Sequence, residues 1–109
     1  MPKTHDENYY AFKPITENPI ILDFSNCENL WAIHDVLKNK FGFPDYYGRN
    51  WSALWDCIDG LFDDEETITV EIHSFAKLEK ELRESCMKML EIFDRVHETT
   101  PNVVFKMIS

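Results

Sequence analysis

The amino-acid sequence predicts an α/β domain in which helices pack on a three-stranded parallel sheet, mainly as a single layer on one side. Two observations support this prediction. Short apolar runs typical of strands alternate along the chain with longer stretches whose apolar residues recur every three or four positions. A helical stretch separates each pair of successive runs, and such crossovers favour parallel pairing with right-handed connections.

Length and composition indicate one folded domain. The chain has 109 residues, and hydrophobic residues make up 44% of it, which excludes a disordered chain. We expect residues 20–109 to form the domain and the polar residues 1–19 to form an N-terminal extension. This extension is either mobile or a strap across the surface that Tyr9, Tyr10 and Phe12 could anchor. Whether it partly covers a binding face is left open.

The charge balance favours a basic protein as partner. There are 20 acidic and 11 basic side chains, and the formal net charge is −9. Direct nucleic-acid binding is disfavoured, because it depends on lysine and arginine at the phosphates. An acidic surface attracts a basic protein over long range, although it also serves solubility alone. No signal peptide and no segment of transmembrane length is evident, so we expect a cytoplasmic protein without a membrane partner.

The first strand and helix are expected before residue 43. Residues 19–24, PIILDF, form a continuous apolar run typical of a strand buried on both faces. Ser25 and Glu28 have the spacing of a capping box, so we expect the helix to begin at Ser25. Gly42 should end it. The apolar positions of this helix are Leu30, Ile33, Leu37 and Phe41.

Residues 44–60, PDYYGRNWSALWDCIDG, predict a loop that leads into a short helix. Gly48 would provide a backbone kink, Asn50 the N-cap and Gly60 a left-handed cap at the C-terminus. Helical periodicity then divides the side chains between two faces. One face holds Trp51, Leu54, Trp55 and Ile58, and the other holds Ser52, Asp56 and Asp59, with Ala53 and Cys57 at its edge.

The remaining elements follow from simple patterns. Residues 63–66 are four consecutive acids, which predicts a solvated loop. Residues 68–73 alternate between apolar and polar, as in a strand at the edge of a sheet. Apolar residues recur at helical spacing over residues 74–97, where we favour two helices with a bend and Ser85 as the second N-cap. The apolar run within residues 102–108 suits a central strand.

The sequence gives little support for enzymatic chemistry. Its three cysteines, Cys27, Cys57 and Cys86, have no CxxC spacing and are interpreted as buried, reduced thiols. The histidines are scattered, and no phosphate-binding glycine loop, HExxH or GxSxG motif occurs. We expect no catalytic residue, no cofactor and no metal. A small hydrolase that uses Cys57 with a histidine brought near it by the fold stays as a third hypothesis.

Aromatic residues crowd the segment around the short helix. Tyr46, Tyr47, Trp51 and Trp55 lie within ten residues, beside Asp56. Aromatic side chains next to a charge are typical of a protein-binding hot spot. The simpler interpretation is that both tryptophans belong to the core and that Asp56 is only solvated.

The stretch YYGRNWSALWDC resembles the signature of the barstar family, small intracellular inhibitors of secreted barnase-type ribonucleases. It matches the family pattern at Tyr46, Tyr47, Gly48, Asn50, Ala53, Leu54, Trp55, Asp56 and Cys57. The resemblance runs from about Ile20 to the C-terminus and implies a barstar-like fold. It also implies a ribonuclease inhibitor, or the immunity protein of a toxin–antitoxin pair, which we expect to be a monomer when free.

The resemblance also implies a binding mechanism. Asp56 would enter the nuclease active site, where its carboxylate takes the place of phosphate in charge-assisted hydrogen bonds with arginine. Tyr46 would pack against the catalytic histidine of the nuclease, whereas His34 matches a family histidine that we expect to be structural. The expected partner-binding residues are Tyr46, Gly48, Asn50, Trp51, Ser52, Ala53, Trp55, Asp56, Asp59, Gly60 and Leu61.

Several positions depart from the inhibitor that is the family's prototype. An aspartate of the prototype is replaced by Ser52, a glutamate on a later helix by Arg95, and a tryptophan by Leu61, while Asp59 restores one negative charge. We therefore expect barnase itself to bind weakly or not at all, and the true partner to be a relative with a modified basic site. The alternative is a barstar-like interaction module whose partner is not a nuclease.

Overall fold

The computed structural model describes residues 7–108, so the first six residues of the expected extension and Ser109 lie outside the described residues. Strands and helices alternate along the chain, as predicted. In order, the elements are η1 (Glu7–Tyr10), β1 (Ile20–Asp23), α1 (Leu30–Phe41), α2 (Trp51–Ile58), β2 (Ile68–His73), η2 (Phe75–Lys77), α3 (Lys80–Ser85), α4 (Met87–Thr99) and β3 (Val103–Ile108).

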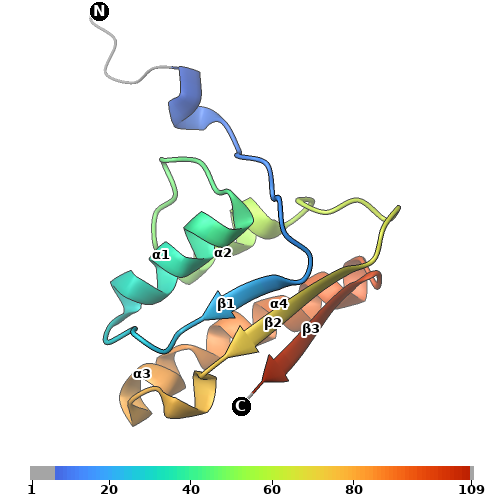
Figure 1. Ribbon diagram of the computed structural model, residues 1–109. Helices are drawn as coiled ribbons and strands as arrows, with labels where there is room; N and C mark the ends of the chain where they lie inside the picture. Colours follow the sequence, from blue (N-terminus) through green and yellow to red (C-terminus); the bar gives the residue numbers. More distant parts are fainter. Residues whose placement is uncertain (1–6, 109) are drawn as a thin grey trace, which may run out of the picture.

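The three strands form a parallel sheet in the order β1-β2-β3, which confirms the predicted fold class (Figure 1). Val70, in the middle of β2, pairs with Ile20 of β1 and with Phe105 of β3. Two predicted strand positions are wrong, because β2 is the central strand and β3 is an edge. The alternating sequence of β2 reflects a sheet face that no helix of the described residues covers, and it does not mark an unpaired edge.

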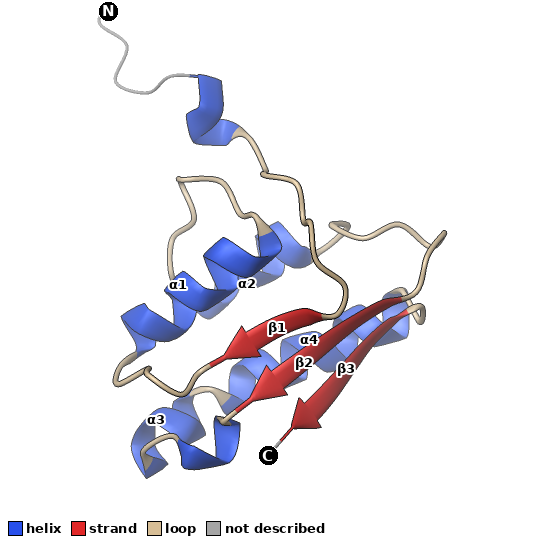
Figure 2. Ribbon diagram, viewed as in Figure 1, coloured by secondary structure: helices blue, strands red, loops and turns tan. Residues whose placement is uncertain are grey.

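Helices cover one face of this sheet, and α4 runs behind β2 and β3 (Figure 2). The strands bury alternate residues, as expected when only one face is covered. Ile20 and Leu22 of β1 are buried, whereas Ile21 between them is half-buried and Asp23 is exposed. The prediction that this strand is buried on both faces is therefore wrong.

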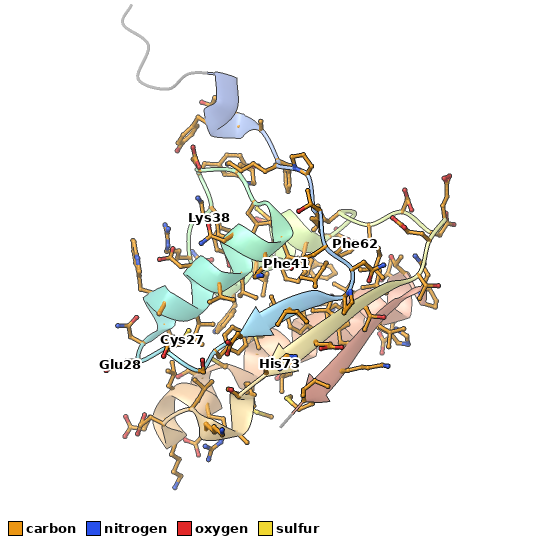
Figure 3. The ribbon with its side chains drawn as sticks, viewed as in Figure 1. Cys27, Glu28, Lys38, Phe41, Phe62 and His73 are labelled. Carbon is orange, nitrogen blue, oxygen red and sulfur yellow. The ribbon has the colours of Figure 1, made fainter. Side chains whose placement is uncertain are left out.

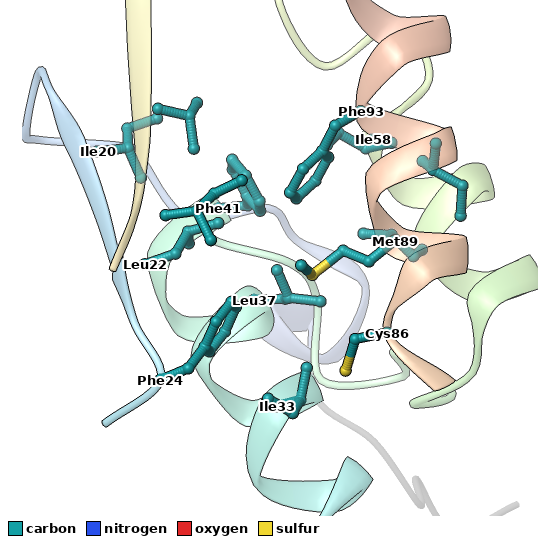
Figure 4. Close-up of a cluster of buried hydrophobic side chains, with 14 of the residues drawn as sticks. Ile20, Leu22, Phe24, Ile33, Leu37, Phe41, Ile58, Cys86, Met89 and Phe93 are labelled. Carbon is teal, nitrogen blue, oxygen red and sulfur yellow. The ribbon is translucent and has the colours of Figure 1, made fainter. Parts of the chain in front are cut away.

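The hydrophobic core fills the space between the sheet and the helices (Figure 4). Phe41, at the end of α1, lies at its centre, because its ring contacts those of Phe43, Phe62 and Phe93 at centroid distances of 5.6, 6.1 and 6.2 Å. Fully burying one such side chain stabilises the fold by about 1.5–3 kcal/mol. This core fixes α1 and the segment that follows it.

Helix α1 begins later than predicted. Its N-cap is Asn29, whose Oδ1 accepts a hydrogen bond of 2.9 Å from the amide of Ala32. The amide of Ser25 instead donates to Oδ1 of Asp23, and Glu28 lies in the loop before α1 (Figure 3). The capping-box prediction is therefore wrong. Gly42 ends the helix in the left-handed conformation, with φ of 70°, as predicted.

Two helices, α3 and α4, cover residues 80–99, which confirms the predicted division of this stretch. Ser85 does not cap the second helix, because it is the last residue of α3. Cys86 joins the two helices with φ of −81° and ψ of −3°, so the backbone stays near the helical conformation. Its amide bonds to the carbonyl oxygen of Leu82, and no side-chain cap is needed there.

Candidate protein-binding site

The loop between α1 and α2 is held by a turn and by contacts to α1. The amide of Tyr47 donates to the carbonyl oxygen of Pro44 at 3.0 Å. The guanidinium of Arg49 donates twice to Oδ1 of Asp35, at 3.0 and 2.6 Å, and lies 4.1 Å from the ring centroid of Trp31. The loop therefore has little freedom relative to α1.

The backbone kink in this loop lies at Arg49, which has φ of 50°, and not at Gly48 as predicted. At Gly48 a side chain is disfavoured because there is little room for a Cβ atom. A Cβ on Gly48 would lie 3.3 Å from Nδ2 of Asn50, the residue that caps the next helix.

A buried hydrogen bond joins the loop to α1. The hydroxyl of Tyr47 lies 2.7 Å from Nδ1 of His34, and the ring of Trp51 packs on His34 at a centroid distance of 4.4 Å. Burial, assisted by the nearby charge of Arg49, lowers the pKa of His34 to about 4. Burial also raises the pKa of Tyr47. Both groups are therefore neutral at pH 7, which agrees with a structural role for His34.

Helix α2 begins after the predicted N-cap, Asn50, but its C-cap is Asp59, one residue before the predicted cap at Gly60. Oδ1 of Asn50 accepts a hydrogen bond of 2.7 Å from the amide of Ala53, which confirms the N-cap. The C-cap is Asp59, and Gly60 follows it with φ of 77°. A hydrogen bond from the amide of Leu61 to the carbonyl oxygen of Ile58 closes a turn around these two residues. Gly60 thus has the predicted left-handed conformation, in a turn beyond the helix.

The two faces of α2 agree with the predicted pattern in most positions. Ser52, Asp56 and Asp59 are exposed, and Leu54 and Ile58 are buried. Cys57, predicted at the edge of the polar face, is buried in the core. Trp51 and Trp55 are half-buried, so neither belongs wholly to the core.

Five of the predicted partner-binding residues surround one open depression of about 440 Å³. We call it the acidic hollow, because the carboxylates of Asp56 and Asp59 stand on it. Its lining residues are Phe12, Tyr46, Asp56, Cys57, Asp59, Gly60 and Leu61. The other predicted residues lie beside it on α2 and in the preceding loop: Gly48, Asn50, Trp51, Ser52, Ala53 and Trp55.

Two side chains near the hollow are not among the predicted partner-binding residues, although Phe12 was a predicted anchor of the extension and Arg95 a predicted departure from the family's prototype. Phe12 comes from the N-terminal segment, and its only signal in the sequence is an apolar ring within a polar stretch. The guanidinium of Arg95, on α4, lies 4.6 Å from the ring centroid of Trp55. A cation therefore lies on Trp55 at the border of the acidic face of α2.

Sequence comparison decides the family. The profile of the family described as Barstar (barnase inhibitor) matches residues 18–108. The chain belongs to the barstar family. This confirms the resemblance seen in the loop and α2, and the barstar-like fold. Proteins of the barstar family are inhibitors and not enzymes, as expected from the sequence.

The chain is also similar to a protein of Bacillus subtilis (strain 168) with the name "Putative ribonuclease inhibitor YrdF". It is 47% identical to this chain over 57 residues. The alignment covers 52% of this chain and 63% of the relative, which is less than two thirds of its length.

The remaining titratable and thiol groups of the described chain, residues 7–108, were compared with the needs of a metal site and of a thiol nucleophile. Within residues 7–108, no group of histidine, cysteine and carboxylate side chains could hold a metal ion, and no helix is long and apolar enough to cross a membrane. The three cysteines are free thiols, although Cys27 is only half-buried, contrary to prediction. Burial raises the pKa of Cys57, and that of Cys86 to about 11, which disfavours a thiolate nucleophile.

The acidic loop after α2 is exposed at residues 63–66, which confirms the predicted solvated loop. Asn102 holds its backbone, since Nδ2 donates to the carbonyl oxygens of Asp63 and Glu66 at 2.8 and 2.7 Å. The loop thus keeps a fixed course while its carboxylates face solvent.

Proposed function

We propose that this protein is a cytoplasmic inhibitor, or immunity protein, of a barnase-type ribonuclease. The observation that carries the proposal is the exposed carboxylate of Asp56 on a rigid helix, beside the exposed ring of Tyr46 in one hollow. Membership of the barstar family and the likeness to a protein named as a ribonuclease inhibitor support it.

The proposed mechanism is substitution for phosphate. A ribonuclease active site is cationic because it must hold a phosphodiester. Asp56 would accept charge-assisted hydrogen bonds from arginine there, and exclusion of water would strengthen them. Tyr46 would pack on the catalytic histidine of the nuclease, and Asp59, Gly60 and Leu61 would shape the surrounding contact.

Rigidity of the site would lower the cost of binding. The cap at Asn50 and the burial of Leu54 and Ile58 fix α2, while the hydrogen bond between Tyr47 and His34 fixes the loop. Little conformational entropy is then left to lose when the partner binds. Trp51, Ser52, Ala53, Trp55 and Gly48 complete the proposed contact surface.

Electrostatic attraction would speed the encounter. The net charge of −9 and the exposed acidic loop at residues 63–66, which follows Leu61 of the hollow, present a negative surface to a basic partner. Salt screens such attraction, so the association rate should fall as ionic strength rises.

A second candidate function is a contact with a protein that is not a nuclease. Arg95 favours it, because its guanidinium lies over Trp55 at the border of the acidic face. A partner that matches this border would carry both basic and acidic groups. The exposed hydroxyl of Ser52 points to a less acidic contact in the same way.

The deciding experiment is titration of the purified protein against a panel of barnase-type ribonucleases, with binding and RNA cleavage both measured. Inhibition of at least one member at a one-to-one ratio is expected. Asp56→Asn should weaken that binding by about thirtyfold or more, the size of a hot-spot loss.

Glu84→Gln, at an exposed position on α3, removes the same charge away from the hollow and is the matched control. It should change affinity by less than about threefold, a typical surface effect. Equal affinity after Asp56→Asn would remove Asp56 from the mechanism. If folded wild-type protein neither binds nor inhibits any ribonuclease of the panel, the second candidate function is favoured.

A further inference from the structure

We propose that the segment of residues 9–13, here called the N-terminal strap, forms one wall of the partner-binding surface. Its aromatic side chains would contact the same basic ribonuclease that receives Asp56, on the rim of the nuclease active site. This inference rests on the proposed function and adds to it a contact outside the segment, residues 18–108, that matches the barstar family.

The strap is attached to the end of α1. The amide of Lys13 donates to the carbonyl oxygen of Gly42 at 2.8 Å. The backbone passes so close that a Cβ on Gly42 would collide with the carbonyl oxygen of Lys13. Nζ of Lys13 lies 3.3 Å from Oδ1 of Asp45, which also pairs with Lys38. Asp45 directly precedes Tyr46, so the strap is tied to the loop that carries the hollow.

Three tyrosine rings then meet beside the hollow. The ring of Tyr46 lies 6.0 Å from that of Tyr9 and 6.0 Å from that of Tyr10, and the two strap tyrosines are 4.9 Å apart, edge to face. η1, which carries them, stands next to the loop between α1 and α2 (Figure 1). The strap thus lies beside Tyr46, the residue that the family resemblance places against the nuclease.

Phe12 makes the surface continuous with the acidic hollow. Its ring packs edge to face on Phe43 at 6.4 Å, and the same side chain lines the hollow with Asp56 and Asp59. Tyr10, Phe12 and Tyr46 remain 63%, 45% and 43% exposed. Large aromatic rings that are exposed and grouped at one place are typical of a surface that binds another protein.

The chemistry of this patch fits a basic partner. Aromatic faces attract arginine and lysine, and the carboxylates of Asp56 and Asp59, which line the hollow, attract the same groups. Tyrosine also offers a large contact area with few rotatable bonds, so ordering it costs little entropy. In the proposed complex, the strap would contact arginine and lysine side chains on the rim of the nuclease active site, while Asp56 enters the centre of that site.

The test measures dissociation constants of wild-type protein and strap variants for the ribonuclease panel. Tyr10→Ala should weaken binding by about tenfold, and Tyr10→Ala combined with Phe12→Ala by more, as expected for aromatic contacts in an interface. Tyr10→Ala alone leaves the packing of Phe12 on Phe43 in place. Met107→Ala, at a 51% exposed position on β3, is the matched control and should not change affinity.

The outcomes separate this inference from the proposed function. If wild-type protein binds and Asp56→Asn loses binding, but both strap variants bind as wild type, the strap is not part of the surface and the proposed function stands. Tighter binding by the strap variants would show that the strap covers the hollow, which also overturns the inference. If the wild-type protein binds no ribonuclease, both proposals fail together.

Discussion

The hydroxyl oxygen of Tyr47 lies 2.7 Å from Nδ1 of His34, in a part of the core that leaves His34 only 2% exposed. This hydrogen bond joins the middle of α1 to the loop that carries Tyr46. No other protein hydrogen bond of the His34 ring is found within residues 7–108, so the stability of the loop and the ionisation of His34 depend on each other.

Adjacent tyrosines give a matched test of this bond. Tyr47→Phe should lower the free energy of unfolding by about 1–3 kcal/mol, because it leaves a buried ring nitrogen of His34 unsatisfied. Tyr46→Phe removes the same atom from an exposed side chain and should change stability by less than about 0.5 kcal/mol. Urea denaturation at pH 7.5 measures both. Equal losses, or none, would mean that the buried bond contributes little.

Acid should destabilise the protein through His34. Its pKa falls from 6.5 in the unfolded chain to about 4 in the folded protein, mainly because of burial. Between these values the unfolded state binds more protons, so stability is full above pH 6.5 and is lost as the pH falls towards 4. The total loss is roughly 3 kcal/mol, since one pKa unit corresponds to about 1.4 kcal/mol.

The measurement is the unfolding free energy in urea from pH 7.5 to 4.5, for wild-type protein and His34→Gln. The variant should show a flatter profile over this range. Asp23 and Asp45 do not confuse the result, because their hydrogen bonds lower their pKa values below 3.8 and they act in more acidic solution. Parallel profiles would contradict the assignment to His34.

Gly42 and Gly60 separate backbone strain from steric collision. Both have positive φ, 70° and 77°, so alanine at either position costs about 1–2 kcal/mol. Only at Gly42 would the new Cβ also collide with the carbonyl oxygen of Lys13. At Gly60, apart from its two chain neighbours, no atom of residues 7–108 lies within 4 Å of the new Cβ. Gly42→Ala should therefore be clearly the more destabilising variant in thermal or urea unfolding. Equal losses would mean that the strap does not press on Gly42.

Charge reversal at Arg95 tests whether the guanidinium over Trp55 lowers the affinity for barnase. Under the proposed function, Arg95→Glu should raise affinity for barnase at least about tenfold, because like charges across an interface cost several kcal/mol. Lys88→Glu makes the same charge change elsewhere on α4, at an exposed position. A similar gain from both variants would indicate net charge alone, and no gain from either would exclude Arg95 as a barrier to barnase.

Local signals in the sequence were the most reliable. Asn50 caps α2 and Gly42 ends α1, as predicted, because both roles depend on the residue and its nearest neighbours. The capping box at Ser25 failed because its spacing also arises by chance, while Asn29 stands closer to the first buried position, Ile33. When a loop holds more than one good capping residue, as Ser25 and Asn29 here, capping preference alone does not identify the helix start.

Relations between distant segments could not be predicted in the same way. Periodicity in residues 68–73 reports which side chains face the helices, but it does not report how many strands pair with β2. The contact between Arg95 and Trp55, and the place of Phe12 on the hollow, depend on how α4 and the strap pack. Such contacts have no sequence-local pattern.

The parallel order of the strands has a kinetic consequence. β2 pairs on one side with residues 20–23 and on the other with residues 103–108, so no two neighbouring strands form a local hairpin. A long stretch of chain must therefore be closed before either half of the sheet gains its hydrogen bonds, and loop-closure entropy opposes that step. Folding should be limited by the meeting of distant segments, and should be slower than in a helical bundle of the same size.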